Sequence, residues 1–195
     1  MSQAAHSQLS AQDAKLDTPL TRISNVSVEL VNAMSDIVWA INPRKDNLRD
    51  LVQRMRRFAA DVFTAKNIRF EFDAPEIENK LQLGANIRRE VFAIYKECVN
   101  KTVRHSQATR AEIALKLAGD TLQLQIADNG RGFDLEAMIH NSQPPAAYGG
   151  NGLVNIQRRG ADLGGRCEII TFPGGGTTVL LEIPLRSEPP AVAGG

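Results

Sequence analysis

Five polar residues in one stretch of the sequence have side chains that could act on a phosphorylated substrate. They are Glu97, Asn100, Lys101, Arg104 and His105. In a helix, Glu97 and Lys101 lie on one face because they are four residues apart. A carboxylate there could act as a general base, and an amide oxygen could ligate Mg²⁺. Taken alone, the stretch is explained more simply as a solvated helix face with one weak Glu–Lys pair.

A second candidate is an Asp-x-Gly-x-Gly turn formed by Asp128, Gly130 and Gly132, directly after a predicted strand. A carboxylate at a strand end can accept a hydrogen bond from an exocyclic amine such as that of adenine. The glycines permit close backbone approach to a flat ring and a positive φ where one is needed. The alternative is an ordinary tight turn with a capping Asp.

Two further glycine-rich segments could contact phosphate or close a pocket. Gly149 to Leu153 opens a predicted helix, and free N–H groups at a helix start favour phosphate. The alternative there is a flexible loop with a glycine-tolerant N-cap. Gly174 to Thr178 combines glycines with hydroxyl groups and, alone, is more simply a hairpin turn.

The elements that must position these residues follow from hydrophobic periodicity. Apolar residues at three-and-four spacing predict four helices, and alternating residues predict five strands. The helices are expected at 19–41, 47–63, 86–104 and 153–163, and the strands at 68–72, 110–117, 121–127, 166–172 and 177–184. A loop is expected from Asp134 to Gly150. The result is an α+β fold, a two-layer α/β sandwich whose mixed, mostly antiparallel sheet is covered by helices.

Composition excludes several classes of protein. A formal net charge of +1 favours neither a nucleic-acid partner nor an anionic membrane. Cys98 and Cys167 lack metal-site spacing and are expected to be reduced thiols. No apolar run reaches the length of about 18 residues that a membrane span needs, and the first ten residues do not form a signal peptide.

Together, the four motifs resemble the GHKL ATPases (gyrase, Hsp90, histidine kinase and MutL), and most closely the sensor histidine kinases of the NarL-like type. The stretch 96–105 resembles their N box, 128–133 the G1 box and 150–153 the G2 box, and 176–178 matches a glycine–threonine element near the domain end. The segment 34–43 is similar to the one joining their dimerisation helices to the ATPase domain. The resemblance covers residues 20 to 186.

The resemblance implies a role for each candidate residue. Glu97 would be catalytic, assisting phosphoryl transfer, and Asp128 would bind the adenine amine in a pocket shaped by Gly130 and Gly132. The remaining nucleotide-binding residues would be Asn100, Lys101, Arg104, His105, Gly150, Gly152, Leu153 and Thr177. The loop 134–150 would be a lid over the phosphates.

The same resemblance implies a Bergerat-type ATPase fold preceded by a dimerisation-type helix. We expect a disordered tail at 1–17, part of a dimerisation helix and a linker at 18–43, the ATP-binding domain at 44–186 and a disordered tail at 187–195. Its ligand would be ATP or ADP. Its partners would be a phosphoacceptor His segment, a response regulator and a second copy in a homodimer, with no nucleic acid and no membrane contact from this part. The location would be cytoplasmic, as part of a membrane-bound kinase.

Two departures from the family pattern matter. No phosphoacceptor is evident, because His6 lies in a polar tail before Ser7, and His105 and His140 fall within the ATPase part. The chain is therefore expected to hold the second dimerisation helix and the catalytic domain.

The family's Mg²⁺-binding Asn aligns with Lys101. The Lys101 ammonium has no lone pair for a metal. The sequence therefore identifies no metal ligand and leaves open whether the site binds Mg²⁺. Lys101 could partly replace the charge of the ion. This leaves two hypotheses, a phosphotransfer enzyme and a catalytically impaired module that binds nucleotide or dimerises.

Overall fold

The computed structural model describes residues 47–75, 81–140 and 152–185, together with scattered positions between 26 and 39. The chain divides into two units, Met1–Asn42 and Pro43–Gly195. In the first unit, the described positions are helical, and Val26, Leu30, Val31, Met34 and Val38 are exposed. No helix among the described residues is long and apolar enough to cross a membrane.

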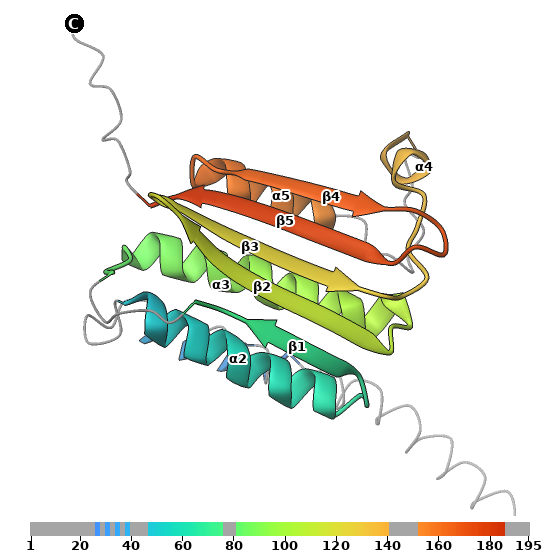
Figure 1. Ribbon diagram of the computed structural model, residues 1–195, viewed down its shortest axis with the longest axis horizontal. Coiled ribbons are helices and arrows are strands. Elements are labelled where there is room, and N and C mark those ends of the chain that lie inside the picture. The colour runs from blue at the N-terminus through green and yellow to red at the C-terminus, as the bar shows by residue number, and fades with distance from the viewer. Residues whose placement is uncertain are drawn as a thin grey trace, which may run out of the picture. The chain divides into compact units, whose positions relative to one another are not determined.

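The second unit is built on one five-stranded sheet with the strand order β1-β2-β3-β5-β4 (Figure 1). The strands are β1 (Arg69–Asp73), β2 (Arg110–Ala118), β3 (Thr121–Asp128), β4 (Arg166–Thr171) and β5 (Thr177–Pro184). Only the β1–β2 pair is parallel, and the other three pairs are antiparallel. The predicted mixed, mostly antiparallel sheet is confirmed.

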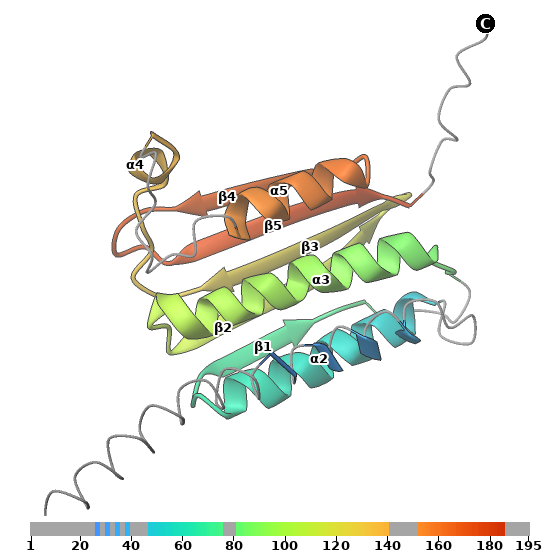
Figure 2. The same cartoon turned by 180° about the vertical axis from the view of Figure 1, so that it is seen from behind.

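The main helices lie on one face of this sheet, as the view from behind shows (Figure 2). They are α2 (Leu48–Thr64), α3 (Ala85–Lys101) and α5 (Gly152–Asp162), and α3 continues into a π-helical turn, η2 (Thr102–Ser106). Every second residue of the central strands is buried against them. These strand residues are Ala111, Ile113, Leu115, Leu122, Leu124, Ile126, Val179, Leu181 and Ile183. This alternation makes the two-layer α+β fold, as the sequence predicted.

Specific side chains fix the helices in register. Asn47 caps α2 by accepting a hydrogen bond from the Asp50 N–H at 2.8 Å. The buried Tyr95 hydroxyl of α3 donates to the carbonyl of Met55 in α2 at 2.9 Å. An ion pair between Glu90 and Arg159 joins α3 to α5. The helix α3, which carries the predicted N box, is therefore bonded to both α2 and α5.

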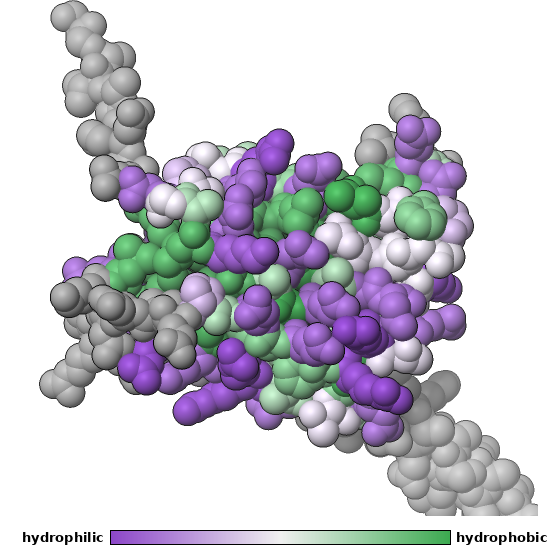
Figure 3. Space-filling view, in the orientation of Figure 1, coloured by the Kyte–Doolittle hydropathy of each residue, from purple (hydrophilic) through white to green (hydrophobic). Residues whose placement is uncertain are grey.

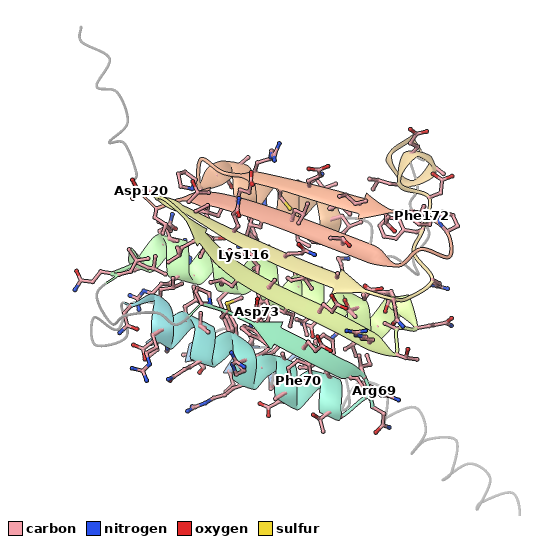
Figure 4. The ribbon with its side chains drawn as sticks, in the orientation of Figure 1. Arg69, Phe70, Asp73, Lys116, Asp120 and Phe172 are labelled. Atoms are coloured by element: carbon pink, nitrogen blue, oxygen red, sulfur yellow. The ribbon has the colours of Figure 1, made fainter. Side chains whose placement is uncertain are left out.

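The opposite face of the sheet carries mixed polar and apolar side chains (Figure 3). It includes a shallow hollow lined by Lys116, Gln123, Leu180 and Glu182, among others. Lys116 is labelled on β2 in Figure 4. Glu182 accepts a hydrogen bond from Gln123 at 3.0 Å and forms an ion pair with Arg166, so this carboxylate is already paired within the sheet.

Two predicted boundaries were wrong. The sequence predicted one helix to Arg104, but the regular α-helix ends at Lys101 and η2 follows. Hydrophobic spacing does not distinguish these forms, because η2 is only five residues long. The predicted loop at Asp134 instead begins with the short helix α4 (Leu135–His140), capped by Asp134, which accepts from the Ala137 N–H at 2.9 Å. Residues 141–151 lie outside the described residues.

Candidate nucleotide site

A pocket lies between the helical layer and the sheet at the C-terminal end of α3. Its walls come from α3 and η2 on one side, β3 and β5 on another, and the first turns of α5. The lining residues are Cys98, Lys101, Thr102, His105, Ser106, Ile126, Asp128, Gly132, Phe133, Leu153, Ile156, Thr177 and Val179. Six of the twelve residues singled out from the sequence are among them. An apolar pocket with a few convergent polar groups is the usual form of a small-molecule site.

Asp128 is the carboxylate of this pocket and ends β3. Its Oδ1 accepts from the Gly130 N–H at 2.8 Å, and its Oδ2 accepts from the Thr102 hydroxyl at 3.2 Å. Burial raises the pKa of Asp128 above its ordinary value, while donors from Gly130, Thr102 and the backbone of Thr177 oppose that rise. The group is thus a half-buried carboxylate whose two oxygens are oriented by fixed donors.

The two glycines after Asp128 are required by the protein's own backbone. A Cβ at Gly130 would collide with the Ser106 carbonyl of η2, and the Arg131 N–H donates to that same carbonyl at 2.7 Å. Gly132 has a φ of +56°, and a Cβ there would collide with the carbonyl of Phe172, which lies at the end of β4 (Figure 4). The glycines therefore let the turn pack against η2 and the β4–β5 hairpin, which the sequence did not indicate.

Glu97 and Lys101 form the predicted pair on one face of α3, with Oε1 and Nζ 3.5 Å apart. The Glu97 side chain is 44% exposed and does not line the pocket, whereas that of Lys101 is 18% exposed and does. Both side-chain ends lie against Gly152, the first residue of α5. The carboxylate thus stands at the rim and the ammonium inside, beside a helix N-terminus.

The other predicted residues have different positions. His105 lines the pocket, and burial, with the nearby charges of Lys101, Arg104 and Arg131, lowers the pKa of His105. Its imidazole is therefore neutral near pH 7. Arg104 is exposed and Asn100 is half-buried, and neither lines the pocket. Gly150 lies outside the described residues.

Leu153 and Thr177 both line the pocket, from α5 and β5 respectively. Sequence reasoning missed the pocket's remaining lining residues. Ile126, Ile156 and Val179 are apolar positions whose periodicity indicated only burial. Thr102 and Ser106 could not be predicted as lining residues, because the sequence predicted a continuous helix and did not indicate η2.

The donor set fits an adenine nucleotide better than it fits a magnesium ion. Asp128 offers an oriented acceptor between apolar walls, which suits an aromatic base that carries an amine. Among the residues described, no three His, Cys, Asp or Glu side chains cluster as metal ligands. The Glu97 carboxylate beside the pocket is paired with the Lys101 ammonium, which repels a divalent cation. The described residues therefore do not form a metal site by themselves, whereas Mg²⁺ bound with a nucleotide takes one or two protein oxygens and the phosphates.

Comparison with protein families gives one match over this region. Residues 86–187, just over half of the chain, match the model described as "Histidine kinase-, DNA gyrase B-, and HSP90-like ATPase". The match begins near the start of α3 and ends just beyond β5, so it contains every described residue of the pocket.

Two curated relatives are named as sensor proteins or sensor-like kinases. A sensor-like histidine kinase of Chloroflexus aurantiacus is 31% identical over 56% of the chain and 18% of its own length. The sensor protein VraS of Staphylococcus aureus is 31% identical over 52% of the chain and 27% of its own length. The chain thus matches less than a third of either relative. This chain matches the solved structure of full-length ShkA in complex with AMPPNP with a TM-score of 0.60 at 17% identity, over 88% of this chain and 38% of ShkA. The two therefore share a fold.

Proposed function

Because this chain belongs to the family of histidine kinase-, DNA gyrase B- and HSP90-like ATPases, and contains the ATP-binding catalytic domain of sensor histidine kinases, we propose that it transfers the γ-phosphoryl group of ATP to a histidine on a partner segment. ADP is the other product. The observation that carries the proposal is the half-buried, doubly hydrogen-bonded Asp128 at the end of an apolar pocket.

Adenine binding follows from the chemistry of that end of the pocket. The Asp128 carboxylate accepts a hydrogen bond from the exocyclic amine, and Ile126, Ile156 and Val179 contact the ring. A buried hydrogen bond to a charged acceptor is worth about 1.5–3 kcal/mol, so this contact orients the base. The phosphates then extend toward Lys101 and His105, which line the pocket beyond Asp128.

Glu97 supplies the base for the transfer step. Its carboxylate stands at the rim, 44% exposed, where a side chain brought by another segment can reach it. The imidazole nitrogen of the incoming histidine forms a bond to the γ-phosphorus as the bond between that phosphorus and the β–γ bridging oxygen breaks. Glu97 accepts a hydrogen bond, and finally the proton, from the other imidazole nitrogen. The leaving electron pair stays on the ADP oxygen.

Lys101 carries the positive charge that the pocket presents at this position. The i,i+4 pair is exposed on its Glu97 side and is worth only about 0.3–0.5 kcal/mol, so phosphate oxygens or an incoming imidazole can separate it. The ion pair with Lys101 therefore does not keep Glu97 from acting as a base. The alternative of a catalytically impaired, nucleotide-binding or dimerisation module finds no support in the family or the relatives.

The wider assignment rests on the relatives, of which one is named a sensor-like histidine kinase and the other a sensor protein. The phosphorylated histidine would pass its phosphoryl group to a response regulator. The helical positions between 26 and 39 would belong to a dimerisation segment at 18–43, and the domain at 44–186 would act on the cytoplasmic side of a membrane-bound kinase. The tails at 1–17 and 187–195 would take no part in catalysis.

Phosphotransfer with a separately supplied acceptor tests this function. The chain is incubated with γ-labelled ATP and a purified dimerisation segment that carries a histidine, and acid-labile label on the segment is expected. A segment with the histidine changed to glutamine is the matched control. If titration shows that ATP is bound but no label appears on the segment, phosphoryl transfer is contradicted. Nucleotide binding would still stand.

A further inference from the structure

Thr102 is a buried polar residue that connects two parts of the pocket. It is 5% exposed, begins η2 directly after α3, and lines the pocket. Its hydroxyl donates to Asp128 Oδ2 at 3.2 Å across 26 residues of sequence. A threonine in a helix commonly bonds a carbonyl of its own helix, so this contact with another element is distinctive.

The surrounding hydrogen bonds hold Thr102 in place. The Ser106 hydroxyl donates to the Thr102 carbonyl at 2.6 Å and accepts from the Ala108 N–H at 3.0 Å. The Ser106 carbonyl in turn accepts from the Arg131 N–H in the turn after Asp128. Thr102 and Asp128 are therefore fixed relative to each other by backbone as well as by side-chain bonds.

Each oxygen of Asp128 has a fixed donor, and the backbone of Thr177 also donates to the carboxylate. Gly130 N–H holds Oδ1 at 2.8 Å, and the Thr102 hydroxyl holds Oδ2. Donors on both oxygens resist rotation of the carboxylate plane about the Cβ–Cγ bond, and Thr102 is the side chain that holds Oδ2. The remaining lone pairs then point in set directions into the pocket.

We propose that Thr102 is the positioning residue for base selection, which aims the Asp128 carboxylate at the exocyclic amine of adenine and so gives the pocket its preference over 6-oxo purines. The inference rests on the proposed binding of ATP at this site. An inosine base presents a carbonyl oxygen where adenine presents its amine. A fixed carboxylate repels that oxygen, whereas a carboxylate free to rotate discriminates less.

Thr102→Val removes the hydroxyl while keeping the branched shape, and Thr102→Ser keeps the hydroxyl as the matched control. Calorimetric titration with ATP and with ITP gives a selectivity ratio for each variant. We expect Thr102→Val to weaken ATP binding about tenfold and to change ITP binding much less, so that the ratio falls. Thr102→Ser should keep the ratio of the unmodified chain.

A purely structural role for Thr102 predicts a different result. Loss of packing would weaken ATP and ITP equally, so an unchanged ratio in Thr102→Val would overturn the inference. If that variant does not fold, Thr102→Ala makes the same comparison. In an Asp128→Asn background, Thr102→Val should cause no further loss of selectivity, and an additional loss there would also overturn it. Failure of the unmodified chain to bind ATP would instead refute the proposed function.

Discussion

The Lys101 ammonium lies 3.5 Å from the Glu97 carboxylate, and the ends of both side chains touch Gly152 at the start of α5. Three residues from two elements, α3 of the N-box region and α5 of the G2-box region, therefore meet at one point beside the pocket. The arrangement separates two tasks, because Lys101 lines the pocket while Glu97 stands exposed at its rim. Binding and transfer should thus respond to different substitutions.

Glu97→Gln should keep nucleotide binding and lose phosphotransfer. The amide has nearly the same shape but cannot accept a proton, and loss of a general base typically lowers a rate by about 10²–10⁴-fold. Labelling of the acceptor segment measures transfer, and titration with ATP measures binding. Equal transfer by the variant and the unmodified chain would show that Glu97 is not the base.

Lys101→Asn should make nucleotide binding more dependent on Mg²⁺. In a chelating buffer, loss of the ammonium should weaken ATP binding by roughly three- to tenfold, the size expected for a partly exposed charge. Added Mg²⁺ should restore part of the affinity, because the amide oxygen can ligate it. Lys101→Arg keeps the charge and is the control. Unchanged affinity of Lys101→Asn in chelator would mean that Lys101 does not contact the phosphates.

Adenosine binding should weaken as the pH falls toward the raised pKa of Asp128. Burial raises this pKa, so the carboxylate is protonated at a higher pH than the ordinary Asp value of about 3.9. Protonation removes an acceptor of the adenine amine, so affinity is full above the raised pKa and is lost as the pH falls through it. Adenosine is used because it has no titrating phosphate. A flat profile from neutral pH down to about pH 4 would rule out ionised Asp128 as the acceptor.

Alanine at Gly130 and at Gly152, two glycines beside the pocket, should have different consequences. Gly130→Ala forces a Cβ onto the Ser106 carbonyl, a backbone atom that cannot move alone, and should destabilise the fold by about 1–3 kcal/mol. Gly152→Ala meets only the flexible ends of Glu97 and Lys101, so it should leave the melting temperature nearly unchanged and weaken ATP binding. Thermal melting and titration of both variants measure the difference, and equal melting temperatures would contradict it.

The sequence predicted the sheet, the helical layer and six of the pocket residues, because periodicity and the four motifs constrain those features directly. It could not place Thr102 in the pocket, since helical spacing does not reveal where α3 becomes the π-helical η2. From the sequence, Gly130 was expected to let the backbone approach the flat ring of a bound base. The structure shows instead that the Ser106 carbonyl excludes a side chain there. Such contacts between distant segments are absent from local patterns. Gly150 and the lid region stay predictions.

Calorimetric titration of the unmodified chain and of Asp128→Asn with ATP tests the central claim most directly. The unmodified chain should bind one equivalent of ATP in a saturable reaction. Asp128→Asn should lose affinity by about 10²-fold, because a charged acceptor is replaced by an amide that cannot present the same oxygens. Absence of binding by the unmodified chain, or equal binding by a correctly folded Asp128→Asn variant, would contradict the assignment of this pocket to adenine nucleotide.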